Sequence, residues 1–326
     1  MKILQVGVGA FGKNHLRVWR ELGHDVYVTD LSVKALGICD VYGIPKERRS
    51  TDYHAFLNSV DAVDVVTPAD VHCPIVMDAI EIRKPVFVEK PLAYSFQEAR
   101  RIAESSNKSG ISVQVGHLFR YNPAFETIME RIQTGDVGDI MFVNGKFSGF
   151  KRTRSDAGVL MTDGIHYIDL ANIVFGKYPD HVYCSRRDNF GRGLEDLAYL
   201  ILDYGAGVSN IEVGNIQPGK SRDFQVVGRK QTIIADLEGQ RVEIIDARHE
   251  KVDDQHWKTV EGATQRPFLV NREPLKEELA DFVFNIEKGK HPDMGAVKAA
   301  NIVKIVETAY VSATEGRRVK FVPFEL

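Results

Sequence analysis

Short apolar runs alternate with segments of helical periodicity along the first third of the chain. The segments between the runs, at 12–22, 53–58, 72–82 and 95–109, carry helical spacing or helix-favouring residues. Alternation of strands and helices over short connections predicts a parallel sheet with helices on both faces. The apolar runs that predict its strands are Ile3–Val8, Asp25–Thr29, Ala62–Val66, Val86–Val88 and Ser112–Val115.

The pattern changes after about residue 120, where strand-like runs begin to follow one another directly. Helices are predicted at 123–133, 157–175, 273–288 and 293–315, and the polar stretch 249–267 is predicted to be a long loop. The sequence therefore predicts an α/β protein of two domains. The first, residues 1–120, has the strand–helix alternation of a Rossmann-type domain, and the second, residues 121–326, is an α+β domain with a large, mainly antiparallel open sheet. The strands predicted for the second domain are Ile140–Phe147, His181–Arg186, Leu197–Tyr204, Val208–Ile216, Phe224–Val227, Thr232–Asp236, Val242–Ala247 and Val319–Val322.

Composition excludes several classes of protein. The 326 residues are 44% hydrophobic and 27% charged, with a net charge of −3, which gives no electrostatic footprint for nucleic acid or for an anionic membrane. No apolar run approaches the roughly 20 residues that cross a bilayer. The N-terminal run MKILQVGVGAFG is interrupted by glycines and is interpreted as a strand, not a signal peptide. Cys39, Cys73 and Cys184 form no CxxC pair, so we expect reduced cysteines, no metal site and a cytoplasmic protein.

A glycine-rich loop follows the first predicted strand and opens the first predicted helix. GVGAFG places glycines at 7, 9 and 12 in the spacing G-x-G-x-x-G. The first two permit a tight turn and close approach of a pyrophosphate, and the third allows close packing of helix on strand. This context predicts a dinucleotide site whose loop residues are Gly7, Gly9, Ala10, Phe11 and Gly12. A purely structural strand–helix turn is the alternative.

Asp30 ends the second predicted strand, 18 residues beyond Gly12. A carboxylate at this position accepts hydrogen bonds from the adenine-ribose hydroxyls and repels a 2′-phosphate. The next residues are Leu31, Ser32 and Val33, with no arginine among them. The sequence therefore favours NAD over NADP, although a helix cap or a turn would also explain the aspartate.

Four further sequence segments, together with the glycine loop, form a recognisable series of motifs. TPADVH (67–72), VEKPLA (88–93), VGHLFRYNP (115–123) and DGIHYIDL (163–170) follow the glycine loop in this order. In this combination the sequence resembles the glucose–fructose oxidoreductase/inositol dehydrogenase (Gfo/Idh/MocA) family. The resemblance implies a dehydrogenase that acts on CH–OH groups with NAD, and a Glu-Lys-Pro turn beside the nicotinamide, often with a cis peptide before the proline.

The Glu-Lys-Pro turn follows a buried parallel strand, and ligands bind at the carboxyl ends of such strands. We expect Lys90 to relay a proton or to stabilise the alkoxide of a substrate hydroxyl. Glu89 would hold Lys90 or face the cofactor. The resemblance also places Thr67, Pro68 and His72 at the cofactor, although His72 could instead cap the helix that begins there.

His166 is the expected general base. It lies on the predicted helix within reach of Asp163, three residues earlier, whose carboxylate could set the tautomer of the imidazole. The family usually has Asp-x-x-x-His, whereas here the position four residues before His166 is Thr162, so the support from Asp163 is uncertain. A lone helical histidine that merely packs is the alternative. The segment VGHLFRYNP and the histidine helix are expected to line the substrate site through His117, Arg120, Tyr121, Asn122 and Thr162, and interdomain packing is their alternative role.

The segment FKRTRSDAG precedes the histidine helix. Its cations could clamp a diphosphate, since guanidinium groups pair bidentately with phosphate oxygens, or could form a solvated face. The surrounding sequence resembles the UDP-N-acetylglucosamine 3-dehydrogenases of the family, which implies a nucleotide-sugar substrate oxidised at C3. The residues expected to bind it are Arg152 and Arg154, next to Lys151.

Alternative functions remain open. A free cyclitol or hexose would undergo the same hydride chemistry, a redox-neutral lyase or glycosidase would use NAD transiently, and a metabolite sensor of this fold would bind the dinucleotide without turnover. Retention of Lys90 and His166 favours an enzyme. A sheet covered by helices on one face needs cover on the other, so we expect a homodimer or homotetramer paired through residues 181–247.

Overall fold

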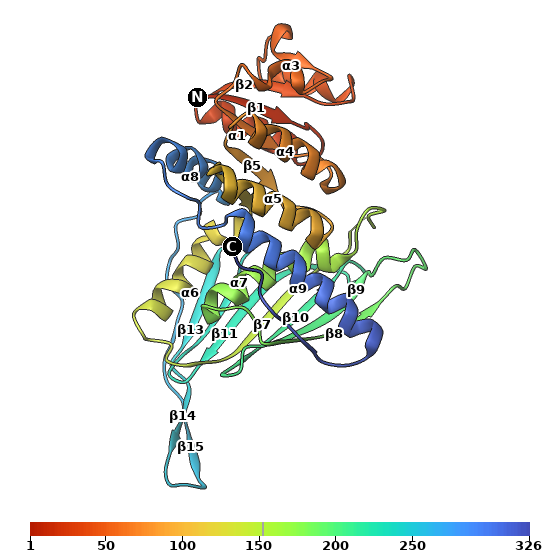
Figure 1. The fold of residues 1–326 in the computed structure, drawn as a ribbon. Coiled ribbons are helices and arrows are strands. Elements are labelled where there is room, and N and C mark those ends of the chain that lie inside the picture. Colours follow the sequence, from red (N-terminus) through yellow and green to blue (C-terminus); the bar gives the residue numbers. More distant parts are fainter. Residues whose placement is uncertain (152) are drawn as a thin grey trace. The chain divides into compact units, whose positions relative to one another are not determined.

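The computed structural model describes residues 1–151 and 153–326, and these form two compact units (Figure 1). The units do not follow a single cut in the chain at residue 120. The first comprises Met1–Leu118, Pro274–Lys304 and Phe324–Leu326, and the second comprises Phe119–Glu273 and Ile305–Pro323.

The first unit is a parallel sheet flanked by helices. Its strands lie in the order β3-β2-β1-β4-β5-β6, and every neighbouring pair is parallel. The chain order reverses between β1 and β4, and dinucleotides bind at such a switch point. The predicted Rossmann topology is therefore confirmed. The strands are β1 (Lys2–Val6), β2 (Asp25–Thr29), β3 (Arg49–Ser50), β4 (Ala62–Val65), β5 (Val86–Glu89) and β6 (Val113–Gly116), and the helices are α1 (Gly12–Glu21), α2 (Ile38–Val41), α3 (His54–Leu57), α4 (His72–Glu81), α5 (Phe96–Ser109) and α8 (Pro274–Lys288).

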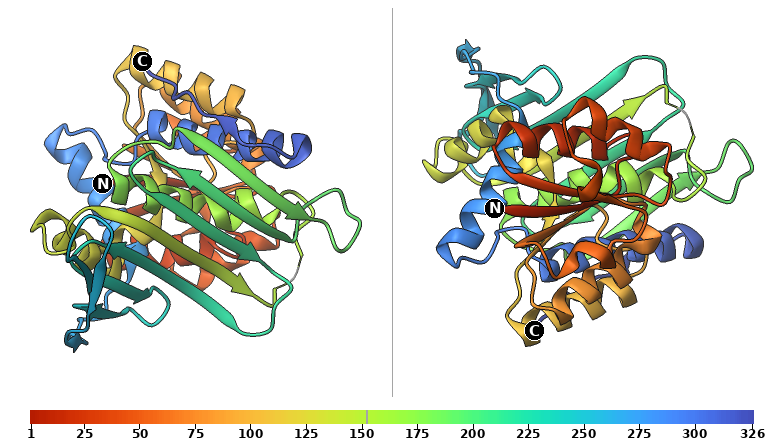
Figure 2. Two further views of the ribbon diagram at one scale, coloured as in Figure 1. Left: turned by 90° about the horizontal axis from the view of Figure 1, so that it is seen from below. Right: turned by 90° about the horizontal axis from the view of Figure 1, so that it is seen from above.

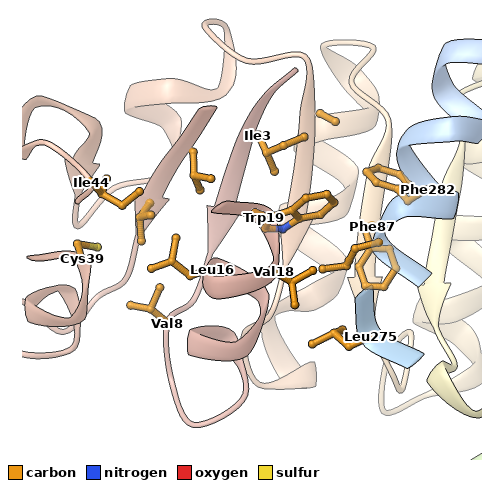
Figure 3. Packing of buried hydrophobic residues seen from close by; sticks show 14 of the residues in the cluster. Ile3, Val8, Leu16, Val18, Trp19, Cys39, Ile44, Phe87, Leu275 and Phe282 are labelled. Carbon is orange, nitrogen blue, oxygen red and sulfur yellow. The ribbon is translucent and has the colours of Figure 1, made fainter. Parts of the chain in front are cut away.

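Helix α8 belongs to the first unit although it lies far along the chain. Its apolar positions Leu275, Leu279 and Phe282 recur every three or four residues and are buried, as expected for one face of a helix. The ring centroid of Phe282 lies 6.4 Å from that of Trp19 on α1 and 5.7 Å from that of Phe87 on β5 (Figure 3). The hydrophobic core thus joins α8 to α1, which explains why 274–304 groups with the N-terminal residues.

The second unit is built on a nine-stranded sheet in the order β16-β13-β12-β11-β7-β10-β9-β8-β17. Its strand pairs are antiparallel except β7 with β10, so the predicted mainly antiparallel sheet is confirmed. Helix α9 (Ala296–Glu315) begins in the first unit and ends in the second. The strands are β7 (Ile140–Gly149), β8 (His181–Arg187), β9 (Leu197–Asp203), β10 (Val208–Gly214), β11 (Lys220–Gly228), β12 (Thr232–Asp236), β13 (Arg241–Ile245), β16 (Thr264–Gln265) and β17 (Val319–Lys320), and the helices are α6 (Pro123–Gln133) and α7 (Ile165–Phe175).

The two faces of this sheet differ. Along β9 the burial alternates, with Ala198, Leu200 and Leu202 buried and Tyr199 and Ile201 exposed. The buried face packs against α6 and α7, whereas the other face is seen without a helix over it in the left view of Figure 2. One face of the sheet is therefore uncovered within the described chain.

Two sequence predictions for this unit are wrong in detail. The stretch 249–267 is not a plain loop, because β14 (Arg248–Lys251) and β15 (Trp257–Val260) form a hairpin and β16 follows it. Its strands carry polar side chains on both faces, so no apolar alternation marked them. The predicted helix 157–175 begins instead as a π-helical turn, Leu160–Gly164, that leads into α7. Short turns of 3₁₀-helix at Ala35–Gly37, Lys46–Arg48, Ala69–Val71 and Leu118–Tyr121 were not predicted.

No helix among the residues described here has the length and apolar character needed to cross a bilayer.

Candidate active site

The glycine loop has the geometry that a pyrophosphate site requires. Gly7 has φ +100°, and a Cβ there would lie 2.7 Å from the Val66 carbonyl oxygen. A Cβ on Gly12 would clash with the Gly7 carbonyl oxygen, whereas none of the described atoms lies within 4 Å of a Cβ built on Gly9. Gln5, which sequence reasoning missed, donates to the carbonyls of Gly7 (2.9 Å) and Gly12 (2.7 Å) and holds the loop closed. The space above Gly9, at the N-terminus of α1, fits the phosphates of a dinucleotide.

A cavity of about 350 Å³ opens beside this loop at the carboxyl ends of β1, β2 and β4. Asp30 borders it, and its two oxygens accept from the backbone N–H groups of Val8 (2.9 Å) and Ser32 (2.8 Å). These bonds fix the carboxylate at the mouth of the cavity. The remaining walls are largely apolar, which suits an adenosine moiety. The lining includes Gly7, Gly9, Leu31, Tyr53, Thr67, Pro68, Val71 and Pro74.

The fit to NAD therefore rests on three features of the first unit, namely the open space at Gly9, the helix N-terminus and the carboxylate of Asp30. Ala10 and Phe11, also expected at the cofactor, are exposed in the same loop.

The Glu-Lys-Pro turn lies at the end of β5, and the Lys90–Pro91 peptide is cis, as the resemblance implied. Glu89 is buried, and its Oε2 accepts from the backbone N–H of Lys90 at 3.2 Å. The imidazole nitrogens of His72 lie 3.0 Å from the Pro91 carbonyl oxygen and 2.9 Å from that of Thr67. Burial lowers the pKa of His72. His72 is thus a bridge between the turn and the loop at Thr67, which neither of its predicted roles described.

His166 lies on α7 in the second unit and is buried against aromatic rings. Its ring centroid lies 5.0 Å from that of Phe119, edge to face, and 6.0 Å from that of Phe147, with an interplanar angle of 11°. Both rings constrain the orientation of the imidazole. A base with a fixed orientation is the arrangement that proton abstraction requires.

Asp163 has a partner that sequence reasoning did not assign. Both of its oxygens accept from Nζ of Lys151, at 3.0 and 3.2 Å. Burial lowers the pKa of Lys151, and the attraction of Asp163 opposes this shift. Thr162 is buried and donates to the Gly158 carbonyl at 3.0 Å. The structure therefore pairs Asp163 with a cation of the preceding segment and gives Thr162 a bond within its own turn.

The remaining residues of the VGHLFRYNP segment differ in their roles. Arg120 forms a bidentate ion pair with the buried Asp169, at 2.7 and 2.5 Å. Asn122 caps α6 by accepting from the Ala124 N–H and donates to the Leu237 carbonyl, so its contacts are those of a structural residue. His117 is buried in the first unit, and Tyr121 is half-buried in the second.

Arg222 on β11 is a site residue that sequence reasoning missed. Its guanidinium carbon lies 3.5 Å from the ring centroid of Phe147, and its Nη1 donates to the carbonyls of Ser148 and Ser221. Burial lowers the pKa of Arg222. Lys151 Nζ lies 4.5 Å from the same ring centroid. Two cations therefore lie on the ring that stacks on His166.

Arg154, one of the two arginines of the predicted clamp, pairs with the Asp156 carboxylate through Nε (2.9 Å) and Nη2 (2.5 Å). The prediction for Arg152 lies outside the described residues. Among the residues that the structure describes, no cluster of histidine, cysteine or acidic side chains could hold a metal ion.

A buried carboxylate supports the start of the histidine helix. Glu195 Oε1 accepts from the Leu160 N–H (3.0 Å) and from the Tyr310 hydroxyl (3.1 Å). A Cβ on Gly158 would lie 2.1 Å from Glu195 Oε2, so that position requires glycine. These bonds anchor the π-helical turn that carries Thr162 and Asp163.

Comparison with known proteins agrees with this geometry. Scyllo-inositol 2-dehydrogenase (NAD(+)) of Bacillus subtilis is 28% identical over 227 aligned positions that span 64% of this chain and 65% of that protein. D-apiose dehydrogenase of Paraburkholderia graminis is 25% identical over 343 aligned positions that span 98% of this chain and 89% of that protein. The structure of UDP-N-acetylglucosamine 3-dehydrogenase GnnA from Acidithiobacillus ferrooxidans has a TM-score of 0.84 at 19% identity, and the match covers 97% of this chain and 98% of that one.

Two family profiles cover most of the chain. Residues 1–117 match the oxidoreductase family with an NAD-binding Rossmann fold, and residues 129–321 match the C-terminal α/β domain of the same family. The chain therefore belongs to the Gfo/Idh/MocA oxidoreductase family and is an NAD-binding enzyme.

Proposed function

We propose that this enzyme transfers a hydride between NAD and a hydroxyl-bearing carbon of a nucleotide sugar. The relatives named for inositol and apiose support a polyhydroxylated substrate, and the neighbour named for UDP-N-acetylglucosamine supports oxidation at C3 of the sugar. The inference that the substrate is anionic rests on two cations, Lys151 and Arg222. Both lie on the Phe147 ring, which stacks on His166.

When bound by the glycine loop and Asp30, NAD would supply the acceptor for the hydride of the substrate carbon. His166 takes the hydroxyl proton, because hydride leaves readily only as that proton departs. Lys90 stabilises the alkoxide that develops and is the second member of the proton relay. Asp30 and the glycine loop hold the cofactor, and Lys151 and Arg222 hold the phosphate oxygens. His166 returns the proton in the reverse direction.

The charges around Phe147 favour an anion over a neutral sugar. Lys151 and Arg222 carry two positive charges, and Asp163 compensates one of them at 3.0 Å. The guanidinium of Arg222 donates to carbonyl oxygens and has no carboxylate at ion-pair distance among the described residues. A buried cation without a counter-ion is costly, and a phosphate would reduce that cost. A free cyclitol or hexose is the alternative substrate.

The decisive test is the absorbance of NADH across a panel of nucleotide sugars, sugar acids, free sugars and cyclitols. We expect formation of NADH with nucleotide sugars at a higher kcat/KM than with their neutral counterparts. Higher kcat/KM with neutral cyclitols would replace the nucleotide sugar by the alternative substrate. Binding of NAD with no turnover on any member of the panel would favour the metabolite sensor.

Replacement of Lys151 and Arg222 tests whether they bind the anionic group of the substrate directly. Lys151→Met and Arg222→Met are each expected to raise KM for a nucleotide sugar about 10–100-fold, the effect of losing one hydrogen bond to a charged group. KM for a neutral sugar should change little. Lys220→Met is the matched control, because Lys220 is exposed and paired with Glu238. Equal changes in KM for the neutral and the anionic substrate would contradict an anion subsite.

Cofactor choice gives an independent prediction. Because the Asp30 carboxylate is fixed at the mouth of the cavity, it should repel the 2′-phosphate of NADP. NAD should therefore bind more tightly than NADP, and Asp30→Ala should narrow the difference. Titration of both cofactors by fluorescence measures this, and equal affinities in the parent enzyme would contradict the role of Asp30.

We further infer that the uncovered face of the nine-stranded sheet pairs with a second copy of the chain. Tyr183, Tyr199 and Ile201 are 40%, 44% and 39% exposed on this face, and Tyr183 lies opposite Ile201 in the β8–β9 register. Light scattering should give a dimer or tetramer, and Ile201→Glu should shift it toward monomer. Val252→Glu, at an exposed position in the β14–β15 turn, is the control. A species of 36.6 kDa alone at micromolar concentration would refute the pairing.

A further inference from the structure

A histidine with two carboxylate partners lies inside the first unit. His15 is on α1, one turn after Gly12, and is completely buried. Its Nδ1 lies 3.0 Å from Oδ2 of Asp64 on β4, and its Nε2 lies 3.2 Å from Oε1 of Glu89 on β5. Asp64 also accepts from the Trp19 indole N–H at 2.6 Å. Three ionisable side chains from a helix and two adjacent strands therefore meet away from water.

The geometry determines the charge of His15. Each imidazole nitrogen of His15 lies at hydrogen-bond distance from a carboxylate oxygen, and an ionised carboxylate can only accept, so this arrangement favours a proton on both nitrogens. Burial by itself lowers the pKa of His15, but Asp64 and Glu89 outweigh it and raise the pKa to about 10. With both carboxylates ionised, the cluster of His15, Asp64 and Glu89 carries one positive and two negative charges.

Glu89 connects this cluster to the turn that carries Lys90. Its other oxygen accepts from the Lys90 N–H at 3.2 Å. Gly116 lies opposite Glu89 in the β5–β6 register, and a Cβ at that position would come within 2.7 Å of Glu89 Oε1. The missing side chain at Gly116 leaves room for the carboxylate. The contacts therefore run from α1 through His15 and Glu89 to the main chain of Lys90.

We propose that His15 is a positioning residue of the dehydrogenase reaction, which fixes the Glu89 carboxylate and, through it, the Glu-Lys-Pro turn. This inference rests on the proposed role of Lys90. The same helix presents its N-terminus to the cofactor phosphates, so His15 couples the cofactor loop to the lysine that acts on substrate.

Stability alone does not account for the cluster. Burying three ionisable groups carries a desolvation penalty, and apolar residues of similar volume often stabilise a core as well or better. The cluster instead lies at the end of β5, directly before Lys90, on the side of the switch point opposite the Asp30 cavity. A dinucleotide that crosses the switch point has its nicotinamide half on this side. The net negative charge there favours the cationic, oxidised ring over the neutral, reduced ring.

His15→Gln tests the positioning role. Glutamine keeps a donor and a similar length but cannot donate to both carboxylates. We expect kcat to fall about 10–100-fold, the cost of a small misplacement of a reacting group, with little change in the Kd for NADH. Asp64→Asn leaves the contact between His15 and Glu89 in place and should retain most of the turnover while lowering the Tm. The matched control is His256→Gln, which breaks an exposed His–Asp contact of 2.8 Å. Parental kcat in folded His15→Gln, or an equal loss in Asp64→Asn, would overturn the proposal.

Glu89→Gln gives a second test that does not need a substrate or the folding of His15→Gln. Glu89→Gln removes one negative charge from the cluster, which should weaken binding of the cationic NAD more than binding of the neutral NADH. The ratio of Kd for NAD to Kd for NADH should therefore rise about tenfold. A purely structural Glu89 would weaken both cofactors alike, and that result would overturn the proposal. If no polyol or nucleotide sugar is turned over, the proposed function fails, yet this ratio still decides whether the cluster acts on the cofactor.

Discussion

His166→Ala is expected to lower turnover about 10²–10⁴-fold, the usual contribution of a positioned general base. Alanine removes the imidazole that we propose takes the hydroxyl proton, and it leaves the glycine loop, Asp30 and Glu89 in the other unit unchanged. The Kd for NAD should therefore stay at its parental value. Steady-state oxidation of the substrate found in the panel, with cofactor titration in parallel, measures both quantities.

The pH profile strengthens this test. Because an imidazole ordinarily changes charge between pH 5 and 8, oxidation by the parent enzyme should rise with pH through this range, and the limb should be absent in His166→Ala. Asp163→Asn is the comparison variant, because its carboxylate pairs with Lys151 and its loss should cost less turnover than that of His166. Near-parental turnover in His166→Ala would move the role of base to Lys90.

Features that depend on local backbone geometry could be predicted from the sequence. Gly7 must be glycine because its φ is positive, and Gly12 must be glycine because a Cβ there would clash with the Gly7 carbonyl oxygen. Both glycines lie within one segment of six residues. Asp30 could likewise be predicted as a cofactor-binding residue from its local position, because it directly follows the second strand. The apolar run Leu197–Tyr204 likewise predicted a strand, which the structure shows as β9.

Features that depend on pairing across long separations could not be predicted. In the sequence, His15 is an ordinary helical position. Only the order of the parallel strands brings it next to Asp64 and Glu89, which lie 49 and 74 residues away along the chain. Arg222 was missed because β11 was expected to begin at Phe224, whereas it begins at Lys220 and lies beside β7. The hairpin of β14 and β15 has no apolar face, so periodicity gave no signal.

The structure also changes what the predicted residues are expected to do. Arg120 and Asn122 were assigned to substrate, but the first holds Asp169 and the second holds Leu237 and the start of α6. Polar side chains near a site often bind other protein groups and so hold the site in place without contacting the ligand. Lys151 and Arg222 lie on the Phe147 ring that stacks on His166, and we propose that they bind the anion for which the arginine run was predicted.

Lys90→Met is expected to lower turnover at least as much as His166→Ala, by about 10²–10⁴-fold or more. Methionine keeps the length and apolar stem of the side chain but removes the ammonium group, to which we assign stabilisation of the developing alkoxide and relay of the proton. The backbone N–H that binds Glu89 is retained, so the turn should keep its conformation. NAD affinity should therefore change little, and the loss should appear in kcat, because the alkoxide exists only as the reaction proceeds.

Two further measurements separate charge from structure in this prediction. Lys108→Met, at the exposed C-terminal end of α5, controls for the loss of a lysine charge elsewhere on the first unit. Lys90→Ala opens space beside the turn, and a small primary amine in solution should then restore part of the lost rate by supplying the missing cation. Turnover within tenfold of the parent in Lys90→Met, with no rescue of Lys90→Ala by amines, would remove Lys90 from the chemistry. The lysine would then be a residue that shapes the turn, and stabilisation of the alkoxide would have to come from another donor.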